Sequence, residues 1–515
     1  MKKYNKYMKL FQTMVVTGLA YMLNYGINLV LVPYITDNVG TEAYGYVSLA
    51  KQFAEYAAIV VGTLNSFAAR YIAVEYYQEE KKKANIYFSS VFWGDLVLGS
   101  VIFLGALGCI SILQNLLNIL PDILADVKFL FLFIFINFWI TTVFSVFSSV
   151  AIIKNKLDIV GVFKGISYIT EALILYILYM FFPTRVFYVG IGLVAASLVI
   201  VFANIWLCKR HIPELRISKG SFSIGAVKQL VFGGIWTSVN SLGELLNHGL
   251  DLLICNLMLS STAMGQMAIA KMIYSIFQAL YSVVSQAFQP LFLKSYSEKN
   301  TEGLLQELKF SMKISGMFTN VGIAGFIALG LAYFRLWIPG EDINLIYKLT
   351  VITLLTCIPG GPMQPLYYIY ILTVKRKIPC FITLVGGLAN VTAMYFLIKY
   401  TDMGVYAVAG TTAVVMMLIN FVTNPLYMSY VLHLPWHTFY PEIIRNVISC
   451  FVLSSVFKFF SLIFTPGKWL TLIICILLYA IIGCLLHLFI VGNYEDWEKI
   501  KKIIREIRSR YIVDQ

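Results

Sequence analysis

Charged residues and histidine are scarce in this chain of 515 residues. Only 13% of the residues are Asp, Glu, Lys or Arg, five are His, and 59% are apolar. A soluble globular domain contains about 25% charged residues. The composition therefore excludes a soluble domain and predicts an all-α integral membrane protein.

The chain also lacks the cysteine spacings of metal sites and disulfide frameworks. Its eight cysteines include no Cys-x-x-Cys pair, and most lie in apolar segments. This pattern argues against disulfides and a zinc site. We expect no metal and no bound cofactor.

Long apolar segments dominate the sequence instead. About 20 apolar residues cross a bilayer, and the sequence contains fourteen such segments, so we predict about 14 transmembrane helices. They cover roughly 10–35, 43–73, 86–113, 127–153, 159–182, 186–208, 228–259, 263–293, 309–334, 345–372, 378–398, 403–431, 441–463 and 469–491.

The distribution of basic residues predicts the orientation. With the amino terminus inside, 29 of the 39 Lys and Arg residues fall on the inner side, seven fall outside and three lie within spans. The positive-inside rule therefore places both termini in the cytoplasm. It also accounts for the net charge of +13, which we do not take as a sign of nucleic-acid binding. The first apolar stretch has no evident cleavage site, so we expect it to remain as the first helix.

A sequence motif recurs after 220 positions. Residues 41–51 (TEAYGYVSLAK) resemble residues 261–271 (STAMGQMAIAK), and a basic run after the fourth span, 154–156, has a counterpart at 375–377. Six spans separate the copies. This even number predicts two parallel six-helix lobes related by a pseudo-twofold axis along the membrane normal, plus two extra helices.

The repeat also predicts the domain organisation. The N-terminal lobe covers 1–208, a basic cytoplasmic linker 209–228, the C-terminal lobe 229–432, the thirteenth and fourteenth spans 433–493, and a cytoplasmic amphipathic tail 494–515. Isoleucines and Trp497 alternate with basic residues in the tail, as expected for a helix lying on the membrane surface.

Two intramembrane lysines are the main candidate site. Lys51 and Lys271 occupy equivalent positions of the repeat, and a cation in a span costs about 2.5–3.5 kcal/mol on insertion scales, which points to a function. We predict that they contact substrate. A structural alternative pairs Lys51 with Glu55 and Lys271 with Asp251. Further candidate substrate-binding residues are Arg70, Asn24 and Asn28.

Acidic residues and a histidine in the seventh span are candidates for ion coupling. Asn240, Glu244, His248 and Asp251 recur at intervals of four, four and three, which would place them on one interior helical face. We predict that Glu244, Asp251 and His248 bind a proton or another cation. Packing or pairing with lysine is the alternative.

The tenth span contains helix-breaking residues. Pro359, Gly360, Gly361 and Pro362 must interrupt backbone hydrogen bonding within the membrane. Irregular backbone at that depth is tolerated only where protein or water covers it. We therefore predict a hinge or a cavity wall.

With these features the chain resembles a known family. The spans, the two lobes with a terminal helix pair, and residues 39–45 (VGTEAYG) after the first helix are similar to the Wzx-type polysaccharide flippases of the multidrug/oligosaccharidyl-lipid/polysaccharide exporter superfamily. The resemblance implies a protein of the bacterial inner membrane that moves undecaprenyl-diphosphate-linked oligosaccharides, such as O-antigen units, to the outer leaflet. It also implies alternating access coupled to H⁺ or Na⁺, with polysaccharide assembly proteins as candidate partners.

Other functions stay open at this point. A lipid II flippase shares the span number and the cationic residues. In a multidrug or organic-cation antiporter, two lysines would repel the substrate. A membrane-embedded polymerase or glycosyltransferase needs catalytic groups, which the short outer loops lack beyond Glu341 and Asp342. An assembly scaffold would not explain the paired lysines.

Overall fold

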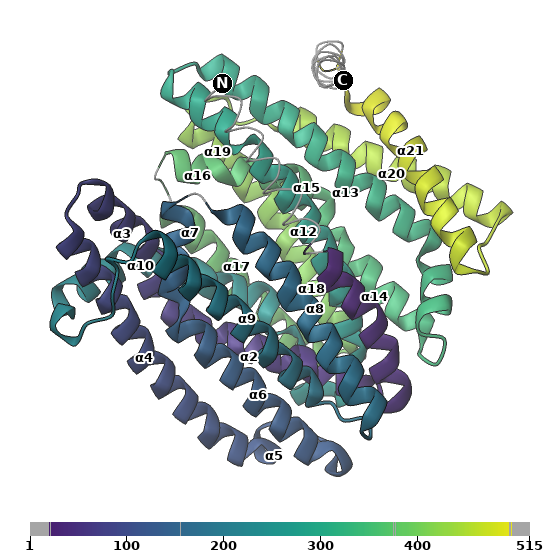
Figure 1. Cartoon of the computed structure of the whole chain (residues 1–515). Helices are drawn as coiled ribbons and strands as arrows, with labels where there is room; N and C mark the ends of the chain where they lie inside the picture. Colours follow the sequence, from purple (N-terminus) through teal and green to yellow (C-terminus); the bar gives the residue numbers. More distant parts are fainter. Residues whose placement is uncertain are drawn as a thin grey trace, which may run out of the picture. The chain divides into compact units, whose positions relative to one another are not determined.

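Helices account for all the regular structure that is described. The computed structural model describes residues 20, 22–154, 156–373, 375, 377–493 and 496, and these ranges contain α-, 3-10 and π-helices and no strand (Figure 1). The all-α membrane class is therefore confirmed. It follows from the apolar composition, because a helix satisfies its own backbone polar groups in hydrocarbon.

Twelve of the described helices are long and apolar enough to cross a membrane. They match the predicted spans except the first and the seventh. The first begins before the described residues. The seventh is divided into α10 (Ile224–Glu244), a π-helical turn (Leu245–Gly249), α11 (Asp251–Ile254) and a second π-helical turn (Cys255–Leu259). The number of fourteen spans therefore stays a prediction.

The chain divides into two compact units, Met1–Ile269 and Ala270–Gln515. The division lies within α12 (Ser261–Ser297), so α10 and α11 belong with the N-terminal helices. The predicted lobe boundaries at 209–228 stay a prediction. Besides the helical residues 22–38, the first unit contains α2 (Thr41–Asn65), α3 (Ala68–Tyr77), α4 (Lys81–Ser111), α5 (Leu113–Leu116), α6 (Leu124–Val143), α7 (Ser149–Ile153), α8 (Leu157–Phe181) and α9 (Tyr188–His211).

The second unit is built from the remaining helices. Two buried apolar clusters hold it together, one around Phe292, Leu308 and Met363 and one around Leu329, Leu453 and Phe457. Its elements after α12 are α13 (Thr301–Trp337), α14 (Ile343–Leu355), α15 (Cys357–Met363), α16 (Tyr368–Leu372), α17 (Lys377–Tyr400), α18 (Val405–Leu418), α19 (Asn424–Val431), α20 (Tyr440–Ile463) and α21 (Trp469–Val491).

The helix boundaries repeat between the units as the sequence motif does. In the first unit, a 3-10 turn over Ser145–Ser148 separates α6 from α7. In the second, 219 positions later, a 3-10 turn over Gln364–Tyr367 separates α15 from α16. The same helix is therefore interrupted at the same place in both halves of the chain.

The connection between α9 and α10 is fastened to α4. The side chain of Asn85 accepts a hydrogen bond from the backbone N–H of Arg216 at 2.7 Å, and the hydroxyl of Ser89 donates to the Arg216 carbonyl at 3.1 Å. Lys81 forms an ion pair with Glu214 at 2.9 Å. This part of the predicted linker therefore belongs to the N-terminal unit.

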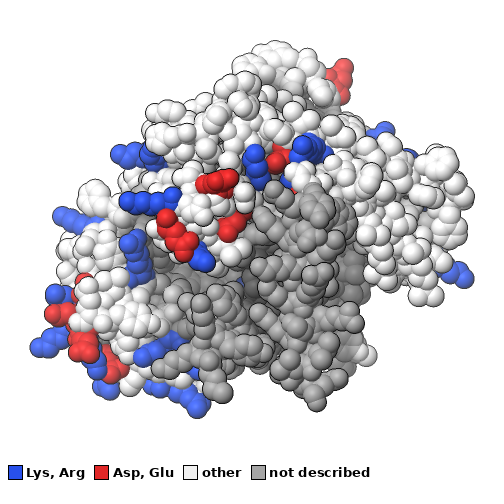
Figure 2. Space-filling view, turned by 90° about the horizontal axis from the view of Figure 1, so that it is seen from above, with Lys and Arg blue, Asp and Glu red and all other residues white. Residues whose placement is uncertain are grey.

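Charged side chains collect at helix ends. Lys81 begins α4 and Lys83 pairs with Glu80 just before it, and both ion pairs formed here are exposed. On the face shown in Figure 2, Lys and Arg lie beside Asp and Glu in several places. Exposed pairs of this kind contribute about 0–1 kcal/mol, so they affect orientation and solubility more than stability.

Candidate functional site

The two copies of the repeated motif pack against each other in the first unit. A Cβ atom on Gly45 would lie 2.9 Å from the Cα of Gly265, the glycine at the equivalent position. The hydroxyl of Thr262 donates to the carboxylate of Glu42, again its equivalent, at 2.8 Å. The recurring glycines are therefore explained by the close approach of α2 and α12, which a larger residue would prevent.

Lys51 lies further along α2 from this contact and is half-buried. Among the described residues it forms no ion pair with Glu55, so the intrahelical alternative is not observed. Its charge acts instead on Glu171 of α8, a carboxylate with 4% of its surface exposed. The next residue, Gln52, has a buried side-chain oxygen with no hydrogen-bond partner in the described structure. Lys51 thus lies in a polar environment within the span.

The polar residues of the seventh span do not share one environment. Asp251 is 1% exposed, His248 is half-buried and Glu244 is exposed. The predicted common face assumed an unbroken α-helix, but the π-helical turn at 245–249 changes the angle between successive side chains. The common face of these residues and their role in ion coupling stay predictions.

Asp251 and the first π-turn face α2. The hydroxyl of Tyr56 donates to the backbone carbonyl of Gly249, and the charges of Asp251 and Glu55 both act on Tyr56. Nearby, the hydroxyl of Ser238 on α10 donates to the Ile59 carbonyl at 3.0 Å. The helix that carries the predicted acids is therefore bonded to the helix that carries Lys51.

The remaining substrate-binding candidates of the first unit differ in their exposure and in their hydrogen bonding. Asn24 and Asn28 are half-buried one turn apart, and the Asn28 amide donates to the Asn24 carbonyl at 3.0 Å. Arg70 is exposed on α3. The substrate role of all three stays a prediction.

In the second unit, Lys271 is half-buried on α12. Pro359, Gly361 and Pro362 are buried and Gly360 is half-buried, all within the short helix α15. The helix is interrupted on both sides of them, at Thr356 and at the 3-10 turn 364–367. The proline and glycine residues therefore coincide with an interrupted helix as predicted, and their role as a hinge stays a prediction.

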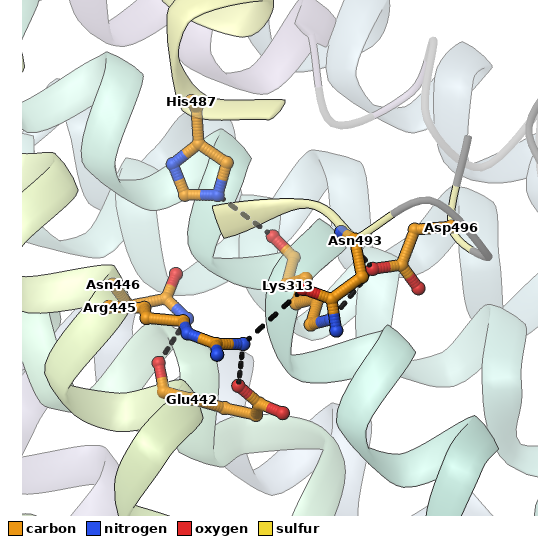
Figure 3. A network of polar contacts seen from close by, with 7 residues as sticks. All are labelled: Lys313, Glu442, Arg445, Asn446, His487, Asn493 and Asp496. Carbon is orange, nitrogen blue, oxygen red and sulfur yellow. Dashed lines mark hydrogen bonds and ion pairs between the residues drawn. The ribbon is translucent and has the colours of Figure 1, made fainter. Parts of the chain in front are cut away.

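The sequence reasoning missed a buried polar network in the second unit (Figure 3). The ammonium of Lys313 on α13 forms a 2.6 Å ion pair with Asp496, and both side chains are at most 10% exposed. His487 of α21 approaches the Lys313 carbonyl at 3.2 Å and the Ser449 hydroxyl of α20 at 2.8 Å. The lone histidine in a very apolar span was the available signal. The network joins α20 and α21 to α13.

No group of three or more metal-ligating His, Cys, Asp or Glu side chains occurs in the described part of the chain. The first unit carries the half-buried cation of Lys51 and the buried carboxylates of Asp95, Glu171 and Asp251.

Comparisons with known proteins give similar membrane proteins. Residues 10–296 match the family model described as polysaccharide biosynthesis protein. The uncharacterized membrane protein EpsK of Bacillus subtilis (strain 168) is 24% identical over 490 residues, covering 95% of this chain and 97% of that protein.

Solved structures show the same fold at low identity. The lipid II flippase MurJ, in an inward closed conformation, superposes with a TM-score of 0.64 at 16% identity, covering 91% of this chain and 98% of that one. An inward-facing multidrug resistance MATE family transporter of the MOP superfamily gives 0.63 at 15% identity, covering 79% and 94%.

Proposed function

Because the chain belongs to the polysaccharide biosynthesis protein family, we propose that it is a flippase for undecaprenyl-diphosphate-linked oligosaccharides. It moves them from the cytoplasmic to the outer leaflet of the bacterial inner membrane, for the synthesis of a surface polysaccharide. The family match and the fold bear out the predicted resemblance to the polysaccharide flippases of the exporter superfamily. The transported lipid is the proposed part.

The observation that carries the proposal is the half-buried Lys51 together with its repeat equivalent Lys271. A lysine ammonium is a compact charge suited to phosphate oxygens. The charge of Lys51 acts on the buried carboxylate of Glu171, and a lipid diphosphate would be a further anionic partner for it. Lys51 and Lys271 would each supply a cation to the diphosphate during the transport cycle.

Transport against a gradient requires an energy source, which we assign to a proton or Na⁺. Asp251 is the best placed of the predicted coupling residues, because it is buried and acts on Tyr56 of the lysine-bearing helix. A cation bound near Asp251 would change the field at α2 and so the affinity of Lys51 for an anion.

The test is polysaccharide export in a strain that depends on this protein. We expect Lys51→Ala combined with Lys271→Ala to abolish export at normal protein levels in the membrane. The matched control is Lys82→Ala combined with Lys458→Ala, which removes one exposed lysine from each unit and should leave export unchanged. Full export by the double lysine variant would refute the proposal.

A complementation test distinguishes the proposed function from the nearest alternative. The fold likeness to MurJ favours a lipid II flippase as the second candidate. A lipid II flippase would restore cell-wall synthesis when the resident flippase is depleted, whereas a flippase for polysaccharide units would not.

A further inference from the structure

Asp95 is a buried carboxyl that the proposed transport site does not use. It is the only charged residue of α4 after Lys83, it lies near the middle of a candidate membrane span, and its side chain is 0% exposed. An ionised carboxylate at such a position is costly unless it is paired or neutralised. Its surroundings therefore decide which charge state it holds.

Two neutral groups are its partners. The amide of Asn65 donates to one carboxylate oxygen at 3.0 Å, and the hydroxyl of Ser145 donates to the other at 2.9 Å. Among the described residues Asp95 forms no ion pair. The ionised form thus has hydrogen bonds but no countercharge, which leaves it only partly compensated.

Both partners stand where a membrane helix is interrupted. Asn65 is the last residue of α2, and residues 66 and 67 separate it from α3. Ser145 is the first residue of the 3-10 turn between α6 and α7. One carboxyl therefore bridges two interrupted helices of the first unit.

Tight packing keeps this bridge in place. A Cβ atom on Gly94 would lie 2.7 Å from the Cδ2 atom of Leu64 on α2, and one on Gly99 would lie 3.4 Å from the Cγ2 atom of Thr142 on α6. The glycines on either side of Asp95 thus allow α4 to approach both helices. Small changes at either interruption must act directly on the carboxyl.

The partners can also serve a neutral carboxylic acid. A protonated carboxyl donates one hydrogen bond, and a serine hydroxyl is able to accept as well as donate. The side-chain oxygen of Asn65 is buried without a hydrogen-bond partner in the described structure, so rotation of the amide would offer it as an acceptor. Protonation would therefore let the side chain at one of the two interruptions accept a hydrogen bond from the carboxyl instead of donating one to it.

We propose that Asp95 is a proton-binding site whose occupancy is coupled to the geometry of the α2–α3 and α6–α7 interruptions. A solvent proton adds to the carboxylate and removes the buried charge, and its release restores the two donated hydrogen bonds. The site is independent of which lipid the protein moves, so it goes beyond the proposed function.

The elements packed against α4 carry further acidic and basic side chains. None of them pairs with Asp95 in the described structure. They are Glu42, Lys51 and Glu55 on α2, Arg70 and Glu75 on α3, Asp126 and Lys128 on α6, Lys228 and Glu244 on α10, and Lys219 in the connection before α10.

The experiment is hydrogen–deuterium exchange of the full-length protein in lipid nanodiscs, corrected for intrinsic rates, across roughly pH 5 to 9, where buried carboxyls titrate. In the wild type we expect amide exchange at 64–69 and 143–149 to change with one midpoint. Asp95→Asn should abolish this dependence. The matched control Asp126→Asn, a buried aspartate paired with Arg185, should retain it.

Ser145→Ala keeps the proposal testable should Asp95→Asn fail to fold. Loss of the hydroxyl donor destabilises the ionised form, so the midpoint should move up by roughly one pH unit. The proposal would be overturned if the pH midpoint of exchange were unchanged or lower in Ser145→Ala, or if the pH dependence of exchange were unaltered in Asp95→Asn. It would also be overturned if exchange in the wild type responded to Na⁺ instead of pH. No transport assay enters these outcomes.

Discussion

The same helix interruption is stabilised by different chemistry in the two units. In the first unit, residues 124–153 contain no proline or glycine, and the 3-10 turn at Ser145–Ser148 is held by the hydrogen bond from Ser145 to Asp95. In the second unit, Pro365 is the second residue of the turn at Gln364–Tyr367. Pro365 has no N–H for the carbonyl of Gly361. That carbonyl accepts hydrogen bonds from the backbone N–H of Gln364 and, at 2.7 Å, from the hydroxyl of Ser315.

The partners are themselves equivalent in the repeat, because Ser315 follows Asp95 by 220 positions. One unit thus uses a titratable group and the other a neutral hydroxyl at the same place. A proline-driven interruption is permanent, whereas one held by a carboxyl depends on protonation. The comparison indicates that the first unit carries the adjustable interruption and the second the fixed one.

Removal of the carboxyl should have the largest effect. Asp95→Ala leaves the Asn65 amide and the Ser145 hydroxyl without an acceptor, so we expect the free energy of unfolding to fall by about 2–4 kcal/mol. Unfolding by SDS in mixed micelles measures it. Asp402→Ala, at an exposed aspartate, is the control, and an Asp95→Ala loss no larger than the control's would break the comparison.

Removal of the Ser315 hydroxyl should have the next largest effect, and the size of this effect should depend on Pro365. Ser315→Ala leaves the Gly361 carbonyl with the Gln364 N–H alone and should lower the free energy of unfolding by about 0.5–1.5 kcal/mol. In a Pro365→Ala background the loss should shrink, because residue 365 then supplies a backbone N–H. A double-mutant cycle in the same SDS assay should give coupling of about 1 kcal/mol.

Ser461→Ala is the matched control for this cycle. Ser461 is a buried serine that donates to the Lys458 carbonyl three residues earlier, with no proline involved. It should not couple to Pro365→Ala. Equal coupling at both serines would show that the proline is not the cause.

The serines at the end of the Ser145–Ser148 turn and the start of α7 should have the smallest effect. Ser148 and Ser149 donate to the carbonyls of Ser145 and Val146 at 2.7 and 2.6 Å. Such local bonds compete with regular helix. Replacing both serines with alanine should change the free energy of unfolding by less than about 1 kcal/mol and slow amide exchange at 145–149. Faster exchange there would contradict this.

Composition and local residue chemistry predicted much of the fold. The scarcity of charge indicated the membrane class, and the proline and glycine residues at 359–362 indicated the interrupted tenth span. The sequence analysis did not predict the interruption at Ser145 or the π-turns after Glu244. No proline or turn motif at these positions indicates them. They depend on contacts between distant residues such as Asp95 and Ser145.

In the candidate site, too, some features could be predicted from the sequence and others could not. The equivalence of Lys51 and Lys271 is visible in the sequence, as is the glycine at the fifth position of each motif. The pairing of Lys313 with Asp496 joins residues 183 positions apart, and no local pattern connects them. Buried pairs of this kind require the packed helices to be known.

The central claim is that Lys51 and Lys271 bind a lipid diphosphate. Native mass spectrometry of the protein purified from its own host tests it directly, by comparing the wild type with Lys51→Ala/Lys271→Ala and with the Lys82→Ala/Lys458→Ala control. The account predicts a polyprenyl-diphosphate oligosaccharide on the wild type and the control but not on the Lys51→Ala/Lys271→Ala protein. Equal retention by all three proteins, or bulk phospholipid alone on each, would contradict it.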